Sequence, residues 1–154
     1  MADPEFVIQQ HVATSLHYYF RLEVRGVMRS WAVPKGPSTD PADKRLAVQV
    51  PDHPLSYADF EGRLGPGYGE GAVIVWDMGD YEPLTDGDFG AALDDGHASF
   101  ELHGQKLVGA WTLRRTDAGR KPKWLLIKKR DEHAGDGAAL PPESVLSGKT
   151  IEDL

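Results

Sequence analysis

The sequence contains no cysteine among its 154 residues. This absence excludes a disulfide framework and a cysteine-ligated zinc site. The sequence also lacks a run of about 18 apolar residues, which a membrane-spanning helix needs, and it has no basic-then-apolar signal at its start. A chain of this length can bury a core of its own. We therefore expect one soluble, cytoplasmic domain with no membrane partner.

The sequence has few basic residues: 17 basic residues against 24 acidic ones give a net charge of −7. This balance disfavours a protein that binds nucleic acid over its whole surface. The charges are uneven, however: acidic residues concentrate in 77–101, whereas basic residues recur in 21–45 and 114–130. Phosphate binding depends on the local field rather than on the total charge. A basic groove on an acidic protein therefore remains compatible with the sequence.

Most of the periodicity is of the β type. The strands that we expect, two pairs of which form hairpins, lie within residues 20–34, 46–50, 72–79, 98–115 and 123–130. Gly26 marks the first hairpin turn, and residues 87–94 predict a short helix with Asp86 as its N-cap. Many short strands separated by Gly and Pro predict a mainly β fold, an antiparallel barrel or sandwich with one or two short helices.

The two ends of the chain differ from the rest. Residues 1–6 look like a remnant of an expression vector. Residues 134–154 are polar and contain proline, which is typical of a flexible tail or a linker. We expect a single domain over residues 7–133.

The stretch HVATSLHYYFRLE, residues 11–23, carries the most information about function. If a strand begins near residue 16, alternation places His17, Tyr19, Arg21 and Glu23 on one face and Tyr18, Phe20, Leu22 and Val24 on the other. The second face is the core side, so the first would form the wall of a polar pocket. His11 would fold back onto this wall from a loop. An ordinary solvated strand explains the pattern about equally well, because two histidines six residues apart are a weak metal signal.

A second group of polar residues lies further along the chain. Lys35 lies in a loop rich in Pro and Gly, Arg45 begins a strand, and His53 and Tyr57 occupy a turn-rich segment. Cations that a rigid backbone holds in place bind phosphate well. Taken singly, each of these residues is equally compatible with an ordinary surface position.

Several motifs follow one another in order: HxxxxxHxxxRLE, SWAVPKGPSTDP, KRLAVxVxDHPLxYxxFEG, YGxGxVIVWDxG and WLLIKKRDE. In this order they resemble the 3'-phosphoesterase domain of bacterial DNA ligase D, over residues 6–133. The resemblance implies a compact antiparallel β-barrel with a polar groove. It also implies removal of 3'-ribonucleosides and 3'-phosphates from primer-template DNA ends during non-homologous end joining, which leaves a 3'-OH. The implied partners are these DNA ends, together with ligase and polymerase domains in cis or in trans.

The resemblance also implies roles for particular residues. By position, the metal-binding histidines match His11 and His17, and the other active-site residues match Gln9, Arg21, Lys35, Arg45, His53 and Tyr57. Arg21, His53 and Tyr57 would act in catalysis, while phosphate would be held by Gln9, Arg21, Lys35, Arg45 and His53. The implied cofactor is Mn²⁺, which would polarise the phosphate and activate water.

Tyr19 departs from the family, which has an aspartate ligand at this position. A neutral phenol with a pKa of about 10 is a poor ligand for manganese. Affinity should therefore fall, and the preference should drift towards Zn²⁺ or another divalent metal. Two hypotheses follow: a phosphoesterase of reduced activity in which Glu23 or Asp52 supplies the missing carboxylate, and a noncatalytic module that binds DNA 3' ends. The oligomeric state stays open.

Overall fold

Nine β-strands dominate the computed structural model of the chain, which describes residues 4–12, 15–55, 60–64, 71–117, 119–137 and 140–153. The strands are β1 (Glu5–Val12), β2 (Leu16–Val24), β3 (Val27–Val33), β4 (Arg45–Pro54), β5 (Gly62–Leu64), β6 (Gly71–Pro83), β7 (His97–Gly104), β8 (Val108–Asp117) and β9 (Lys123–Lys128). One helix, α1 (Phe89–Asp94), and a 3-10 turn, η2 (Ile151–Asp153), complete the described elements.

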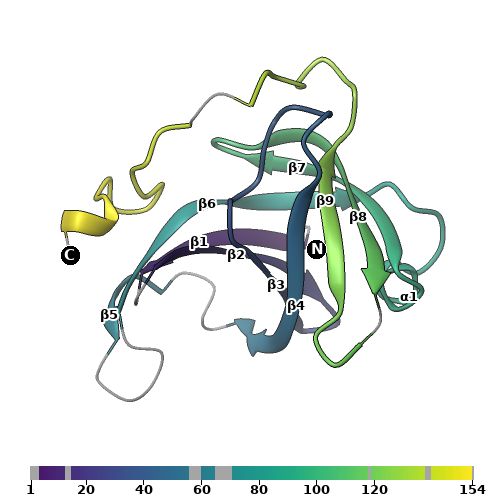
Figure 1. The fold of residues 1–154 in the computed structure, drawn as a ribbon, viewed down its shortest axis with the longest axis horizontal. Coiled ribbons are helices and arrows are strands. Elements are labelled where there is room, and N and C mark those ends of the chain that lie inside the picture. Colours follow the sequence, from purple (N-terminus) through teal and green to yellow (C-terminus); the bar gives the residue numbers. More distant parts are fainter. Residues whose placement is uncertain are drawn as a thin grey trace.

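The strands close into a barrel. Around it they follow the order β1-β2-β3-β4-β9-β8-β7-β6, all pairs are antiparallel, and β1 also pairs with β6 (Figure 1). The short strand β5 adds to β6 beside the barrel. Closure leaves these eight strands without a free edge. The predicted mainly β fold is confirmed, and the barrel replaces the alternative of a sandwich.

Large aromatic side chains fill the interior. Trp31, Trp111 and Trp124 are completely buried, and the rings of Trp31 and Trp124 meet edge to face at 5.6 Å. Phe20 and Leu22 of β2 join this core. The core side that alternation predicted for residues 16–24 is therefore confirmed.

Three local predictions were wrong. His11 belongs to strand β1 rather than to a loop. The helix starts at Phe89 with Asp88, not Asp86, at its N-cap. Strand β4 does not stop before Pro51 but continues to Pro54, because an irregularity in its pairing with β3 accommodates a residue that has no N–H to donate.

Parts of both chain ends pack against the barrel. Phe6, which the sequence analysis set apart, is completely buried in the core. In the C-terminal segment, Leu140 packs against the core, and the Val145 N–H donates to the carbonyl of Val75 in β6 at 3.0 Å. Ser144 is buried and donates to the carboxylate of Glu61. The described part of this segment thus forms a strap along β6. The described residues contain no helix long and apolar enough to cross a lipid bilayer.

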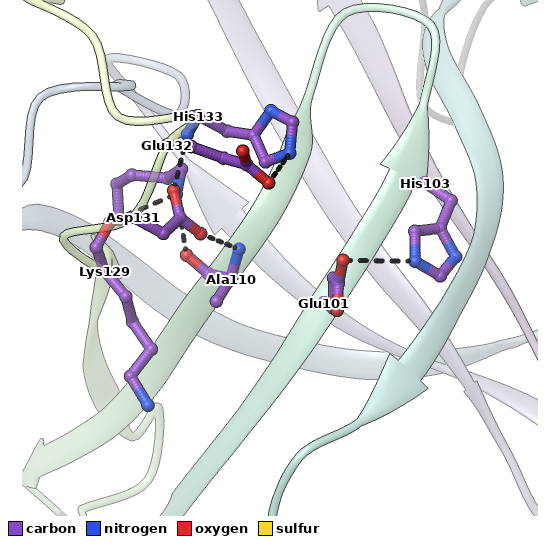
Figure 2. Close-up of polar contacts among 8 residues, drawn as sticks. Glu101, His103, Ala110, Lys129, Asp131, Glu132 and His133 are labelled. Atoms are coloured by element: carbon purple, nitrogen blue, oxygen red, sulfur yellow. Dashed lines mark hydrogen bonds and ion pairs between the residues drawn. The ribbon is translucent and has the colours of Figure 1, made fainter.

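Lys128 anchors the end of β9, where the strap begins. Its ammonium group is buried and donates to the carbonyls of Ala110 and Lys129 at 3.2 and 3.1 Å and to Asp131 at 2.5 Å. The Asp131 carboxylate also accepts the N–H groups of Ala110 and His133, as Figure 2 shows. Burial would raise the pKa of Asp131, but these hydrogen bonds outweigh it and lower the pKa to about 2.

Candidate functional site

Strands β1 and β2 bring most of the predicted site residues onto one outer face of the barrel. His11 lies directly opposite His17, Gln9 opposite Tyr19, and Val7 opposite Arg21. Because directly opposite residues have Cβ atoms about 4.5–5.5 Å apart, the two imidazoles are within reach of one ion. We call this surface, formed by Gln9, His11, His17, Tyr19, Arg21 and His53, the histidine face.

The rings of the histidine face lie close to one another. The His11 and Tyr19 ring centroids are 5.9 Å apart at an interplanar angle of 40°. The Nε2 atom of His17 lies 3.0 Å from the hydroxyl of Ser15. Tyr19 therefore lies between His11 and Arg21, at the position for which the resemblance implies an aspartate.

Arg21 is the buried cation of this face, with only 3% of its surface exposed. Its Nε donates to the amide oxygen of Gln9 at 2.9 Å, and Nη1 donates to the hydroxyl of Ser30 at 2.7 Å. Its guanidinium carbon lies 5.1 Å from the centroid of the Tyr19 ring. Two hydrogen bonds and a ring contact fix the guanidinium fork, which favours recognition of a phosphate in a defined orientation.

His53 reaches the same face from β4, where it lies opposite Met28 of β3. Partial burial and the positive charge of Arg21 lower its pKa from 6.5, and the carboxylate of Asp52 opposes them only in part. The lowered pKa favours the neutral imidazole, which can accept a proton.

An apolar cluster adjoins Arg21 and His53. Val7, Met28 and Val75 are completely buried together, and Val145 of the strap packs against them. Water is thus excluded from one side of the face, and electrostatic interactions gain strength where water is excluded.

The structure separates Lys35 and Arg45 from the histidine face. Alternation places Arg45 on the same side of β4 as the core residue Ala47. Both cations line a pocket of about 250 Å³ with Tyr18, Trp76 and Leu140, which we call the mouth pocket. Tyr57 lies outside the described residues.

The two carboxylates considered as replacement ligands lie elsewhere. Glu23 accepts the N–H of Glu5 at 2.9 Å, six residues along β2 from His17, which corresponds to roughly 20 Å in an extended strand. Asp52 lies 3.7 Å from Arg29, with which it forms an ion pair. Glu23 is therefore too far from His17 to share an ion with it, and Asp52 is engaged by Arg29.

Within the described part of the chain, one group of three His, Asp or Glu ligands lies within 4.8 Å of one another: Glu82, Glu101 and His103. These residues are on β6 and β7, and Figure 2 shows Glu101 directed at His103. The Nδ1 atom of His103 also lies 2.6 Å from a carboxylate oxygen of Asp80, and this hydrogen bond is the main cause that raises the pKa of His103. No motif in the sequence marks this group, and its only signal is the acidic stretch 77–101, which contains Glu82 and Glu101 but not His103.

The histidine face fits a divalent metal only in part. Its donors are two imidazoles and a phenol, and imidazole nitrogen suits zinc at least as well as manganese. The carboxylate that would favour manganese is missing from these positions.

The family model and the relatives that match this chain all belong to DNA ligase D. The family described as "DNA Ligase D 3'-phosphoesterase domain" matches residues 9–115. A protein of Pseudomonas aeruginosa named "Multifunctional non-homologous end joining protein LigD" is 52% identical over 153 residues, which cover 95% of this chain and 18% of the relative.

A protein of Mycobacterium tuberculosis named "Multifunctional non-homologous end joining DNA repair protein LigD" is 42% identical over 144 residues, which cover 93% of this chain and 19% of the relative. The similarly named protein of Mycolicibacterium smegmatis is 39% identical over 136 residues, which cover 83% of this chain and 17% of the relative. The chain thus spans less than a fifth of the length of these relatives.

Proposed function

Because this chain belongs to the family of DNA ligase D 3'-phosphoesterase domains, we propose that it hydrolyses 3'-phosphates and 3'-ribonucleosides at primer-template DNA ends. The products would be clean 3'-OH ends for non-homologous end joining, with ligase and polymerase domains acting in the same or in separate chains. The observation that carries the proposal is the buried guanidinium of Arg21, which Gln9 and Ser30 hold in place near His53.

Each residue of the face has a proposed task. Arg21 binds nonbridging phosphate oxygens and neutralises the charge that grows in the transition state. His53 holds or transfers a proton at its ring nitrogen. Gln9 acts as a positioning residue, because its amide oxygen accepts Arg21 Nε at 2.9 Å. Tyr57 is proposed to donate a hydrogen bond to the phosphate.

His11 and His17 would hold the metal, Mn²⁺ or a softer ion such as Zn²⁺. A bound ion supplies Lewis-acid polarisation of the phosphate and a more acidic water. The cross-strand pairing of the two imidazoles supports this assignment.

Tyr19 favours a second candidate function, a noncatalytic module that grips DNA 3' ends. The phenol leaves the metal with one anionic ligand fewer, while the buried cation of Arg21 persists. Such a module would still bind a 3'-phosphate through Arg21.

The test is 3'-end processing of a labelled primer-template that ends in a 3'-phosphate or in one ribonucleotide, over a titration of manganese and of zinc. We expect wild type to process the end, and we expect His17→Ala and Arg21→Met to lose at least about a hundredfold in rate. His97→Ala, which removes an exposed histidine of β7, is the matched control.

Wild type that binds the 3'-phosphate end tightly without processing it would support the binding module. If His97→Ala loses as much activity as His17→Ala, the loss is not specific to the histidine face, and the proposed role of this face in the reaction is wrong.

A further inference from the structure

The β3–β4 loop and the chain after β9 lie side by side at one end of the barrel (Figure 1), where the Gly135 N–H donates to the carbonyl of Thr39 at 2.9 Å. Residues of both segments line the mouth pocket. Lys35, Thr39 and Arg45 supply polar groups, Tyr18 and Trp76 supply aromatic walls, and Leu140 comes from the strap. Among the described residues that line the pocket, none is acidic. The pocket is therefore a positively charged cavity on a protein whose net charge is −7.

The loop that carries Lys35 is held tightly against the barrel. Gly36 has a φ of +74°, and a Cβ there would lie 2.9 Å from the Tyr18 ring. Only glycine lets the backbone approach the ring this closely. The Lys35 ammonium is thus attached to a fixed segment of backbone rather than to a loose loop.

One buried donor of Arg45 has no acceptor among the described residues. Its Nε is buried, and no described residue accepts a hydrogen bond from it. Asp43 lies 3.9 Å from Nη2, and the same carboxylate oxygen accepts the hydroxyl of Ser38 at 2.7 Å. Burying an N–H donor without an acceptor is unfavourable. An oxyanion in the mouth pocket would supply acceptors for Arg45, Lys35 and the Thr39 hydroxyl together.

We propose that the mouth pocket binds a phosphate group of the DNA, separate from the phosphate at which the reaction occurs. This inference rests on the proposed function, because it takes DNA as the ligand. The two sites lie on opposite sides of one strand: Tyr18 packs against the core and lines the pocket, whereas its neighbours His17 and Tyr19 face outward. A DNA strand that crosses the rim between them meets a cation at each site.

The test is binding of a labelled primer-template, without divalent metal so that no turnover occurs, over a range of salt concentrations. In Lys35→Met/Arg45→Met we expect about tenfold weaker binding, the size expected for losing charge-assisted hydrogen bonds. The slope of log affinity against log salt should become shallower by about 1, because one phosphate contact is lost.

Arg120→Met/Lys121→Met is the matched control, because it removes the same charge from the β8–β9 turn at the other end of the barrel (Figure 1). Thr39→Asp compared with Thr39→Asn adds an isosteric test within the pocket. We expect the carboxylate of Asp to weaken binding and the amide of Asn to leave it nearly unchanged. An unchanged salt slope in Lys35→Met/Arg45→Met, or an equal change in the control, would overturn the proposal.

Processing at saturating DNA separates this site from the catalytic one. Lys35→Met/Arg45→Met should raise KM and keep kcat, whereas a loss of kcat with normal binding would place these cations in the chemistry and overturn the separate site. If wild type shows no turnover, the proposed function fails while the binding series still tests the pocket.

Removing the 5'-phosphate of the template shows which phosphate the mouth pocket binds. The loss of affinity in Lys35→Met/Arg45→Met persists if the pocket binds an internal phosphodiester, and it disappears if the pocket binds this terminal phosphate. If inorganic phosphate binds in the mouth pocket but wild type and Lys35→Met/Arg45→Met bind DNA equally, the proposal that the pocket binds a DNA phosphate is wrong.

Discussion

Replacing Tyr19 by aspartate should exchange intrinsic stability for metal-dependent stability. The Tyr19 ring lies 5.9 Å from the His11 ring and 5.1 Å from the Arg21 guanidinium. Contacts of these two kinds contribute about 1–2 kcal/mol together. Since about 1 kcal/mol shifts the midpoint of a chain of this size by roughly 2–4 °C, metal-free Tyr19→Asp should melt about 2–8 °C below wild type.

With manganese the order should reverse. The new carboxylate lies on the same face as His11 and His17, at the next cross-strand pair. It completes a set of two imidazoles and one anion, so the dissociation constant for Mn²⁺ should fall at least about tenfold. An ion at a hundred times its dissociation constant stabilises the fold by about 2.7 kcal/mol, or roughly 5–10 °C.

Thermal denaturation and titration calorimetry with Mn²⁺ and Zn²⁺ measure both effects. Tyr19→Asn is the matched control, because it loses the same ring contacts without gaining the charge. Equal responses of the Asp and Asn variants to manganese would refute the placement of a metal between His11 and His17.

Two further predictions follow from the site and its support. Arg21→Met should raise the pKa of His53 part of the way towards 6.5, because burial persists when the neighbouring charge is gone; an NMR titration that shows no rise would contradict this. In wild type, the stability that neutral His53 contributes is complete above about pH 6.5 and is lost as the pH falls through 6.5 towards the lower folded pKa. Gly104→Ala should destabilise the protein by about 1–3 kcal/mol, because a Cβ there would clash with the buried Asp77 carboxylate; chemical denaturation, with Gly119→Ala as the control, measures the loss.

The sequence allowed one face of β2 to be predicted because alternation is a strong local signal. Phe20 and Leu22 are buried in the core, and His17 and Tyr19 face outward as expected. The pairing of His11 with His17 could also have been predicted, because the only element missing from the prediction was a strand at residues 5–12.

Other features depend on contacts between segments that are distant in the sequence, and local patterns could not predict them. Asp77 looked like one member of an acidic stretch, but it is completely buried. It accepts the N–H groups of residues 105, 106 and 107 at 2.9, 3.2 and 2.8 Å. Burial is the main cause that raises its pKa, and these hydrogen bonds oppose the rise. The separation of Lys35 and Arg45 from Arg21 likewise follows from the course of the β3–β4 loop across the barrel mouth.

The division of labour along β2 has a consequence for how this protein can change over evolutionary time. Its even-numbered residues from 18 to 24 pack against the core, so mutations there are selected for folding. Residues 17 and 19 are only half buried on the opposite side, so their chemistry can be exchanged with little effect on the fold. A lineage can therefore exchange the phenol at position 19 for a carboxylate, or the reverse, in one mutational step, while the core side of the strand and the rest of the barrel stay unchanged.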